Sequence, residues 1–549
     1  MLNAVRSVIP SRPPGYVLAT VAVSLAGFLN GFDTGSVGAV MEMPHFGKTF
    51  GTFSPFIHGL TVSMIMLTGA FPSLYAGQLG DILGRLKTIQ VGALLFVVGA
   101  IMQATAHQLP VFIAGRAIGG IGMGTWMSPL AVYVTEIAPS ARRGMLMATP
   151  QLAVTFGIRC GYFTCYGTVR IDSPLSWKSI YIMQSVAGVA LAAACMVIPE
   201  SPRWALLQGD RESAIHLLER LDFSRAEAEK DFLGPAAQRQ ITAQPGPIQG
   251  LVMIFRKPYR SRTTLALVML GMIQLSGIDG VLYYAPILFS QAGLPVTTAS
   301  FVASGLSAIL MFAITIPTLI FVDRFNRRSV TIVGGVLLTF CMFTIGLLYA
   351  TNAVHPTGIA RFVVVALVFI FGLTYCATWG VVGKIYASEI QPAATRSAAN
   401  CVAQGLGFLT NWLVAILTPI LLARSSYSAY FLFGGFCVVS VVGLWCYMPE
   451  TRGQSLEAIE EAFKAPLAGG SRIGRLAKKW AGLRKRVNGG GSSRNSIAGE
   501  ESPTGGGAVS GADTPVELVD MLAAGPEGQS VTTASGLETT MAAVATATV

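Results

Sequence analysis

Charged residues are scarce in this chain. Asp, Glu, Lys and Arg make up 12% of its 549 residues, whereas a soluble globular protein carries about 25%. The sequence also lacks a glycine-rich loop ending in lysine for phosphate, a metal-binding spacing of Cys or His, and a grouping of nucleophile and base. The eight cysteines fall in apolar stretches, which argues against a disulfide framework. We therefore expect no catalysis, no metal and no bound cofactor.

Long apolar runs dominate the sequence instead. Hydrophobic residues account for 52% of the chain, and the mean hydropathy is +0.59. Twelve runs between residues 16 and 448 each reach or approach the roughly 20 residues that a membrane-spanning helix needs. The first run is too long for a cleavable signal peptide. The sequence thus predicts an all-α membrane protein with twelve transmembrane helices in a lipid bilayer.

The net charge of +11 is unevenly distributed along the chain. With the N-terminus assigned to the cytoplasm, 30 of the 38 Lys and Arg residues fall in cytoplasmic segments, five on the other side and three within spans. This bias places both termini in the cytoplasm. The basic excess is therefore a topology signal, and we expect no nucleic-acid partner. We expect the plasma membrane as the location.

The chain consists of two halves that repeat one another. Matching charged motifs follow spans two and eight, four and ten, and six and twelve, at offsets of 242, 253 and 250 residues. Such halves form two pseudo-symmetric six-helix bundles around a cavity at the membrane midplane. The expected segments are a cytoplasmic N-terminus at 1–15, bundles at 16–198 and 263–448, a solvated cytoplasmic linker at 199–262, and a cytoplasmic, largely disordered tail at 449–549.

An acid and a base lie inside the apolar runs. Asp33 falls in the first run and Arg116 in the fourth. An ionisable residue at membrane depth is costly and is kept where it pairs, faces a cavity or takes up a proton. This combination in a chain of many spans points to a proton-coupled carrier, with a proton as the coupling ion. The alternative is a static ion pair that holds the two spans together.

Five motifs give the chain a family resemblance. They are Gly77–Arg85 (GQLGDILGR), Gly115–Gly120 (GRAIGG), Pro199–Trp204 (PESPRW), Gln274–Ile278 (QLSGI) and Pro449–Gly453 (PETRG). Over residues 16–465 the chain resembles the sugar porter family of the major facilitator superfamily, in a fungal form. The resemblance implies a monomeric secondary active transporter that moves a sugar or related polyol by alternating access, with proton symport.

The resemblance also assigns roles to residues. Asp33 matches the family's proton-coupling aspartate, and Arg116 matches its partner. The positions that match substrate-binding or cavity-lining residues are Gln151, Gln274, Asp279, Lys384, Phe408 and Asn411. Tyr283 and Tyr284 match the tyrosines that gate the outer side.

Charged residues gather at the cytoplasmic helix ends. Ion pairs between these ends are expected to latch the two halves while the carrier is open outward, and each is worth about 0–1 kcal/mol. The latch residues are Asp81, Arg85, Glu136, Arg143, Glu200 and Arg203 in the first half, and Asp323, Arg327, Glu389, Arg396, Glu450 and Arg452 in the second.

The chain departs from the family pattern in its substrate site. Ile273, Asp279 and Met311 replace amide residues, and span ten lacks both prolines and has Lys384 in place of a tryptophan. Three interpretations remain open. Asp279 and Lys384 form a buried ion pair; or Lys384 and Arg159 bind the carboxylate of an acidic polyol such as quinate or a sugar acid; or the protein is a nutrient sensor with little transport. Export of a small metabolite is a further alternative.

Overall fold

The computed structural model describes residues 13–139, 142–234, 247–257, 259–293, 298–321, 324–355, 358–391, 393–452 and Phe463. Pro14–Ser471 form one compact unit. The described residues form helices and connecting segments without strands, as the all-α prediction requires. Apart from Phe463, the predicted tail beyond Arg452 lies outside the described residues, as do residues 1–12.

The first bundle contains the six predicted N-terminal spans. The first span bends at Ser24 between two helices, and a short helix, α4 (Pro44–Phe50), follows it. The spans are α2 (Gly15–Val23) with α3 (Leu25–Met41), α5 (Pro55–Leu83), α6 (Arg85–Thr105), α7 (Leu109–Ile137), α8 (Arg143–Thr168) and α9 (Leu175–Val197).

Helix α5 shows how local sequence sets a boundary. Its first residue is Pro55, whose fixed φ suits a helix start, and the Ser54 hydroxyl accepts a hydrogen bond from the Ile57 N–H at 3.3 Å. It ends at Gly84, which adopts a φ of +102° and lets α6 begin at the next residue. The tight turn places the charged motif around Arg85 at one end of the bundle.

The second bundle repeats this arrangement, and two of its spans are broken. Gly277, with a φ of +88°, separates α15 from α16, and Thr378 separates α20 from α21. The helices are α15 (Arg260–Leu275), α16 (Ile278–Tyr283), α17 (Ala285–Gln291), α18 (Thr298–Phe321), α19 (Arg327–Ala350), α20 (Ala360–Ala377), α21 (Trp379–Glu389), α22 (Ala393–Arg424) and α23 (Ser428–Tyr447).

Eleven helices among the described residues are long and apolar enough to cross a membrane. The predicted fifth span, α8, is 26 residues long but is not one of the eleven, because its sequence is more polar than those of the other spans. It packs against α3 of its own bundle and against α18 of the other. Protein therefore covers two flanks of this polar helix.

Small residues allow α3 and α8 to pack closely. A Cβ on Gly31 would lie 1.9 Å from the Val154 carbonyl oxygen, and one on Gly157 would lie 2.3 Å from that of Phe28. Close approach through glycine is a common way for membrane helices to associate, because dispersion contacts replace the hydrophobic effect there. The backbones of α3 and α8 are thus in direct contact.

The linker between the bundles is partly helical. It contains α10 (Pro202–Leu207), α11 (Arg211–Arg220), α12 (Arg225–Ala228), a π-helical turn at Glu229–Leu233 and α14 (Pro247–Met253). Leu218, Ala228 and Phe232 form a small buried core. The Leu221 carbonyl accepts from the Tyr16 N–H at 3.1 Å, and Asp222 Oδ2 accepts from the Gly15 N–H at 2.7 Å. These bonds tie the linker to the start of the first span.

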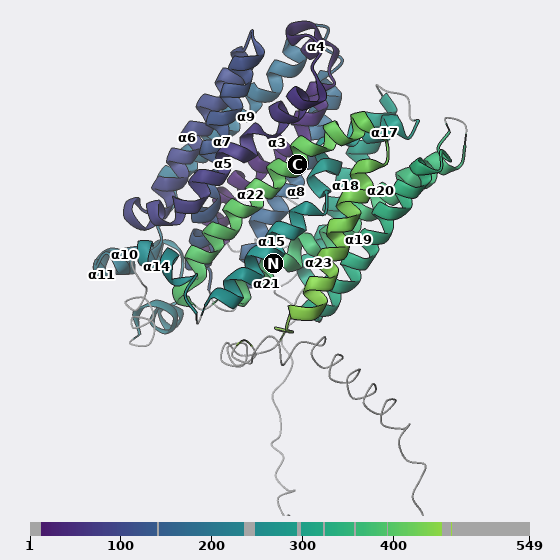
Figure 1. The fold of residues 1–549 in the computed structure, drawn as a ribbon. Coiled ribbons are helices and arrows are strands. Elements are labelled where there is room, and N and C mark those ends of the chain that lie inside the picture. Colours follow the sequence, from purple (N-terminus) through teal and green to yellow (C-terminus); the bar gives the residue numbers. More distant parts are fainter. Residues whose placement is uncertain are drawn as a thin grey trace, which may run out of the picture. The chain divides into compact units, whose positions relative to one another are not determined.

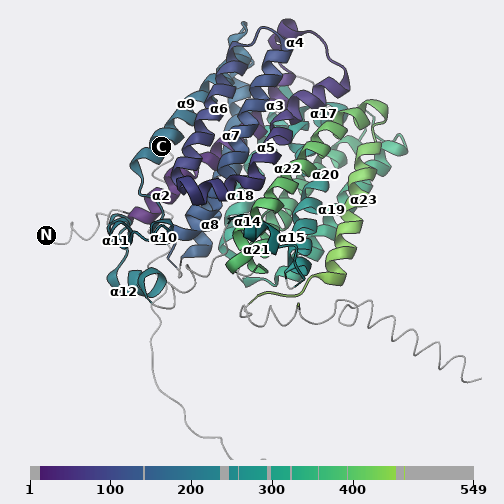
Figure 2. The same ribbon diagram turned by 60° about the vertical axis from the view of Figure 1, so that its left-hand side comes forward.

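The two bundles lie side by side (Figures 1 and 2), with the purple to blue helices in one and the green helices in the other. Their main seams join α5 to α22 and α8 to α18. A Cβ on Gly59 of α5 would lie 2.9 Å from the Ile416 carbonyl oxygen, and one on Gly405 of α22 would lie 2.6 Å from Leu74. Small residues thus line the α5–α22 seam near both of its ends.

Candidate functional site

The predicted acid and base of the first bundle meet in its interior. Asp33 on α3 is 1% exposed and Arg116 on α7 is fully buried. The guanidinium donates to both carboxylate oxygens, from Nη1 to Oδ1 and from Nη2 to Oδ2, each at 3.2 Å. Arg116 Nη2 also donates to the Val62 carbonyl at 2.8 Å, and Gln184 Nε2 donates to Asp33 Oδ1 at 3.4 Å. The site therefore draws on four helices.

A buried pair of this kind is sensitive to protonation. The attraction between the two charges offsets the cost of removing both from water, and loss of one charge leaves the other uncompensated. A proton on Asp33 would remove its charge and weaken both bonds to Arg116. Gln184, in span six, was not predicted, although an amide inside an apolar run is a signal that sequence reasoning could have used.

The two predicted gate tyrosines are buried where α16 of the broken seventh span meets α17. Tyr283 and Tyr284 are each 1% exposed. The Tyr284 hydroxyl donates to the Ala415 carbonyl at 2.8 Å. Gly38 of α3 lies so close to Tyr283 that an added Cβ would be 1.6 Å from its carbonyl oxygen. The first and second bundles are thus in contact at this end.

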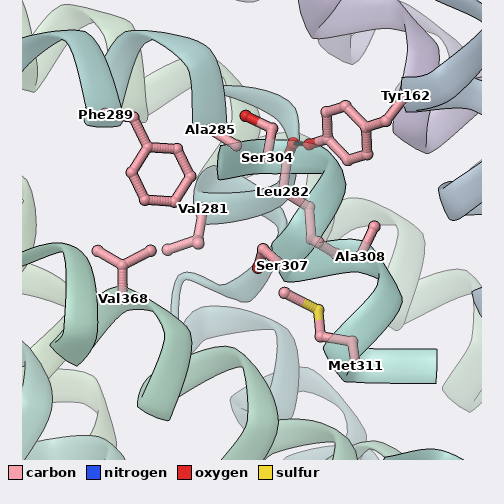
Figure 3. Close-up of a pocket in the computed structure, with 10 residues that line it drawn as sticks. All are labelled: Tyr162, Val281, Leu282, Ala285, Phe289, Ser304, Ser307, Ala308, Met311 and Val368. Carbon is pink, nitrogen blue, oxygen red and sulfur yellow. Dashed lines mark hydrogen bonds between the residues drawn. The ribbon is translucent and has the colours of Figure 1, made fainter. Parts of the chain in front are cut away.

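A second contact between the bundles surrounds a small cavity beside the seventh span. The Tyr162 hydroxyl of α8 donates to the Leu282 carbonyl of α16 (Figure 3). Ser304, Ser307 and Met311 of α18 line the same cavity. Tyr162 thus bonds the backbone next to the predicted gate residue Tyr283, a contact that the sequence did not predict because the two segments are far apart in the chain.

Three polar side chains of the second bundle form a chain of hydrogen bonds. Gln274 Nε2 donates to Asp279 Oδ2 at 2.6 Å, and the Tyr375 hydroxyl donates to Gln274 Oε1 at 3.1 Å. Both ends of the Gln274 amide are therefore occupied. Tyr375, at the end of α20, was not predicted, because no motif points to it. Asp279 is 8% exposed, and its carboxylate faces this chain.

Lys384 reaches across to the other bundle. Its Nζ donates to Gln151 Oε1 on α8 at 2.9 Å, so the two predicted cavity residues meet. Its side chain is nevertheless exposed. Among the described residues, the ion pairs do not include one between Asp279 and Lys384. Their predicted pairing is therefore not formed in this structure, and each binds a neutral amide instead.

Helix α22 carries the last two predicted substrate residues. Asn411 is 7% exposed, and its Oδ1 has no hydrogen-bond partner among the described residues. A buried acceptor without a donor is unfavourable. Phe408 is 5% exposed and lies 3.7 Å from where a Cβ on Gly69 would be, across the seam. Asn411 can thus accept a hydrogen bond from a hydroxyl group of a ligand.

Arg159 contacts aromatic rings and not the predicted substrate residues. Its guanidinium carbon is 4.6 Å from the ring centre of Phe156 and 4.9 Å from that of Phe312. Cation–π contacts of this type stabilise a charge that has no carboxylate nearby. Arg159 therefore belongs to the α8–α18 seam.

The first-half latch residues form one network within their own bundle. Arg85 donates to both oxygens of Glu136, from Nε and Nη2 at 3.0 Å each, and contacts Asp81 at 2.8 Å. The Ser201 hydroxyl donates to Glu136 at 2.5 Å, and Glu200 accepts from the Leu86 N–H at 3.1 Å. Burial raises the pKa of the Glu200 carboxyl, while its backbone hydrogen bonds act in the opposite direction. The guanidinium carbon of Arg203 lies 5.5 Å from the ring centre of Phe232.

The second-half latch residues repeat part of that network. Glu450 accepts from the Arg327 N–H at 2.9 Å, as Glu200 does from Leu86, and Arg452 donates to Asn326 at 3.2 Å. Asp323 and the side chains of Arg143, Glu389 and Arg396 lie outside the described residues. The contacts named here stay within one bundle, so a latch between the bundles remains a prediction.

Tyrosines confirm that the halves are structural repeats. The Tyr133 hydroxyl donates to the Pro199 carbonyl at 2.7 Å, and the Tyr386 hydroxyl donates to the Pro449 carbonyl at 3.1 Å. Two repeated bundles, a buried acid–base pair and broken helices at their interface define a membrane carrier of the major facilitator fold. The chain belongs to the Sugar (and other) transporter family, whose model matches residues 19–463. It is thus a transporter and not an enzyme.

Known relatives span most of the chain. It is 28% identical to a probable glucose transporter of Neurospora crassa, covering 82% of this chain and 79% of the relative. It is also 28% identical to a high glucose sensor of Saccharomyces cerevisiae, covering 82% of this chain and 61% of that protein. Among solved structures, the proton:xylose symporter XylE of E. coli matches with a TM-score of 0.67 and 23% identity, over 81% of this chain and 98% of XylE.

Proposed function

We propose that this chain moves a sugar or a related polyol across the membrane by alternating access, in symport with a proton. The observation that carries the proposal is the buried Asp33–Arg116 pair, since an acid at that depth is kept where it binds a proton or a cation. The names of a glucose transporter and a proton:xylose symporter among its relatives support the cargo and the coupling ion.

Helix α3 offers a direct connection between the proton site and the outer gate. Asp33 and Gly38 lie five residues apart on this helix, one at the ion pair and the other against Tyr283 of the second bundle. Deprotonated Asp33 holds α3 to α7. Protonation weakens that bond, so α3 can shift relative to α16. Because these helices belong to different bundles, the shift changes how the two bundles are oriented toward one another.

The cargo would bind between the bundles. Asn411 Oδ1 offers a buried acceptor, and Gln151 offers an amide that can both donate and accept. Sugar hydroxyls have the same dual capacity. We also propose that the working unit is a monomer in the plasma membrane with both termini in the cytoplasm. The distribution of Lys and Arg supports the placement of the termini.

Asp33→Asn tests the coupling. The substitution keeps the shape of the side chain and removes its charge, so we expect accumulation of radiolabelled cargo against a gradient to stop while counterflow exchange continues. Asp172→Asn, at an acid whose side chain is 95% exposed, is the control and should leave accumulation intact. Uphill uptake by a folded Asp33→Asn protein would rule out coupling through this residue.

A sensor is the second candidate, and the relative described as a high glucose sensor favours it. A sensor would bind cargo with little net transport. Robust, pH-dependent uptake in a host that lacks its own sugar transporters would exclude a purely sensory role.

A further inference from the structure

The substrate region contains a cation, Lys384, that forms no ion pair with the described residues. Lys384 lies on α21, five residues beyond the start of that helix and three residues before the end of the span Ala360–Ala387. Its Nζ donates to one neutral acceptor, Gln151 Oε1, at 2.9 Å. An ammonium group has three donors, so two of them have no partner among the described residues. An unpaired cation at such a position is costly unless it faces water or binds an anion.

Asp279 does not form an ion pair that would compensate the charge of Lys384. Asp279 interacts electrostatically with Lys384, but its carboxylate accepts from Gln274 at 2.6 Å and forms no ion pair with the lysine. The Tyr375 hydroxyl bonds the other end of Gln274, which holds the amide toward Asp279. The acid is thus directed into its own bundle, while the lysine faces the opposite one.

The lysine is also accessible. Its side chain is exposed although its tip lies against Gln151 of the first bundle. Because Nζ faces that bundle, its free donors lie in the space between the bundles, where cargo would bind. Arg159, the other cation considered for this role, lies against the rings of Phe156 and Phe312.

We propose that Lys384 binds a carboxylate on the cargo, so that the substrate is a small polyhydroxylated acid of the sugar-acid class. The inference rests on the proposed transport function and names its substrate class. The carboxylate would take the free donors of Lys384, while hydroxyl groups would bond Asn411 Oδ1 and the Gln151 amide. Lys384 is then the specificity-determining residue of this carrier.

The charge of the cargo determines whether transport moves net charge across the membrane. One proton moving with a neutral sugar transfers one positive charge, whereas one proton moving with a monocarboxylate transfers none. Transport of the preferred cargo should therefore be insensitive to membrane potential.

The test uses the full-length protein in proteoliposomes and probes matched in shape. Galacturonate, gluconate and quinate are compared with the neutral molecules galactose, sorbitol and inositol, respectively, under an inward proton gradient. We expect at least one acid to be preferred over its neutral counterpart by about tenfold or more, because hydrogen bonds between charged groups are the strong ones. Clamping the potential with valinomycin and potassium should leave uptake of that acid unchanged.

Lys384→Gln should abolish the preference, so that the acid and its neutral counterpart are taken up at similar rates. Lys48→Gln, a lysine substitution outside the spans, serves as the control and should keep the preference. Size-exclusion profiles and thermal unfolding identify variants that fail to fold. If Lys384→Gln fails to fold, the preference of the wild-type protein for acids and the effect of membrane potential on its uptake still test the inference. Preference for neutral sugars, or equal loss of both classes in Lys384→Gln, overturns the inference. Proton-driven uptake of galactose without uptake of galacturonate would refute the acidic substrate but would leave the proposed proton-coupled transport intact. Accumulation that does not depend on the proton gradient would refute the proposed function instead.

Discussion

Gly38→Ala should disturb the closed outer side of this carrier. The added Cβ would lie 1.6 Å from the Tyr283 carbonyl oxygen and 2.7 Å from its carbon, far inside contact distance. Both atoms belong to the backbone of α16, so no side-chain rotation can relieve the overlap. Because α3 and α16 belong to different bundles, separating the bundles at this end removes the clash completely.

The size of the effect follows from the cost of overpacking. Adding a methyl group to a tightly packed site costs about 1–3 kcal/mol. Only the outward-closed form bears this cost, and each 1.4 kcal/mol is about a tenfold change in an equilibrium constant. We therefore expect the ratio of outward-closed to outward-open protein to fall by about five- to 150-fold.

Hydrogen–deuterium exchange measures this shift. Opening of the outer side would expose Ile278–Tyr283 and Ala285–Gln291, so their amides should exchange faster in Gly38→Ala than in the wild type. Gly47→Ala is the matched control, because a Cβ there meets nothing within 4 Å. Unchanged exchange in α16 and α17 of a folded Gly38→Ala protein would refute the contact as a determinant of closure.

Three further predictions concern the gate and the cytoplasmic network. Tyr284→Phe removes the bond to the Ala415 carbonyl within the second bundle and should loosen α16 and α17 against α22 by about 1 kcal/mol, seen as a smaller exchange increase than for Gly38→Ala. Glu136→Gln leaves the buried Arg85 charge poorly compensated and should destabilise the protein by about 3–5 kcal/mol in denaturant unfolding, whereas Glu212→Gln on exposed α11 should change little; equal stabilities would contradict the buried network. Because burial raises the pKa of Glu200, the native state binds its proton more tightly than the unfolded state, so this residue favours folding below pH 4.5 and loses that effect as pH rises through its folded pKa; Glu200→Gln should remove this part of the pH dependence of the melting temperature.

Much of the fold could be predicted because membrane helices leave strong signals. Length and hydropathy located the spans, and the repeat of Glu200 at Glu450 indicated two related bundles, which the matching bonds of Tyr133 and Tyr386 confirm. The meeting of Asp33 and Arg116 could be anticipated from the cost of burying each charge alone.

Other features depend on contacts that the sequence does not display. Span ten breaks at Thr378 without a proline, and the Trp379 Nε1 bond to the Thr331 carbonyl at 2.8 Å holds the start of the next helix. Gln151 and Lys384 are 233 residues apart, so their contact depends on how the bundles approach one another. The order of the linker likewise depends on its bonds to Gly15 and Tyr16.

Glu200 and Glu450 each stabilise one of the two bundles from within. Glu200 follows the last span of the first bundle and binds the start of its third span at Leu86, and Glu450 does the same at Arg327 in the second. Directional bonds therefore hold the two ends of the chain segment that forms each bundle's last four spans together at one end of that bundle. The α5–α22 seam, by contrast, rests on glycines such as Gly59 and Gly405, whose contacts have little directional preference. Two stiff bodies joined by a smooth surface can rock without breaking the bonds that keep each of them in shape.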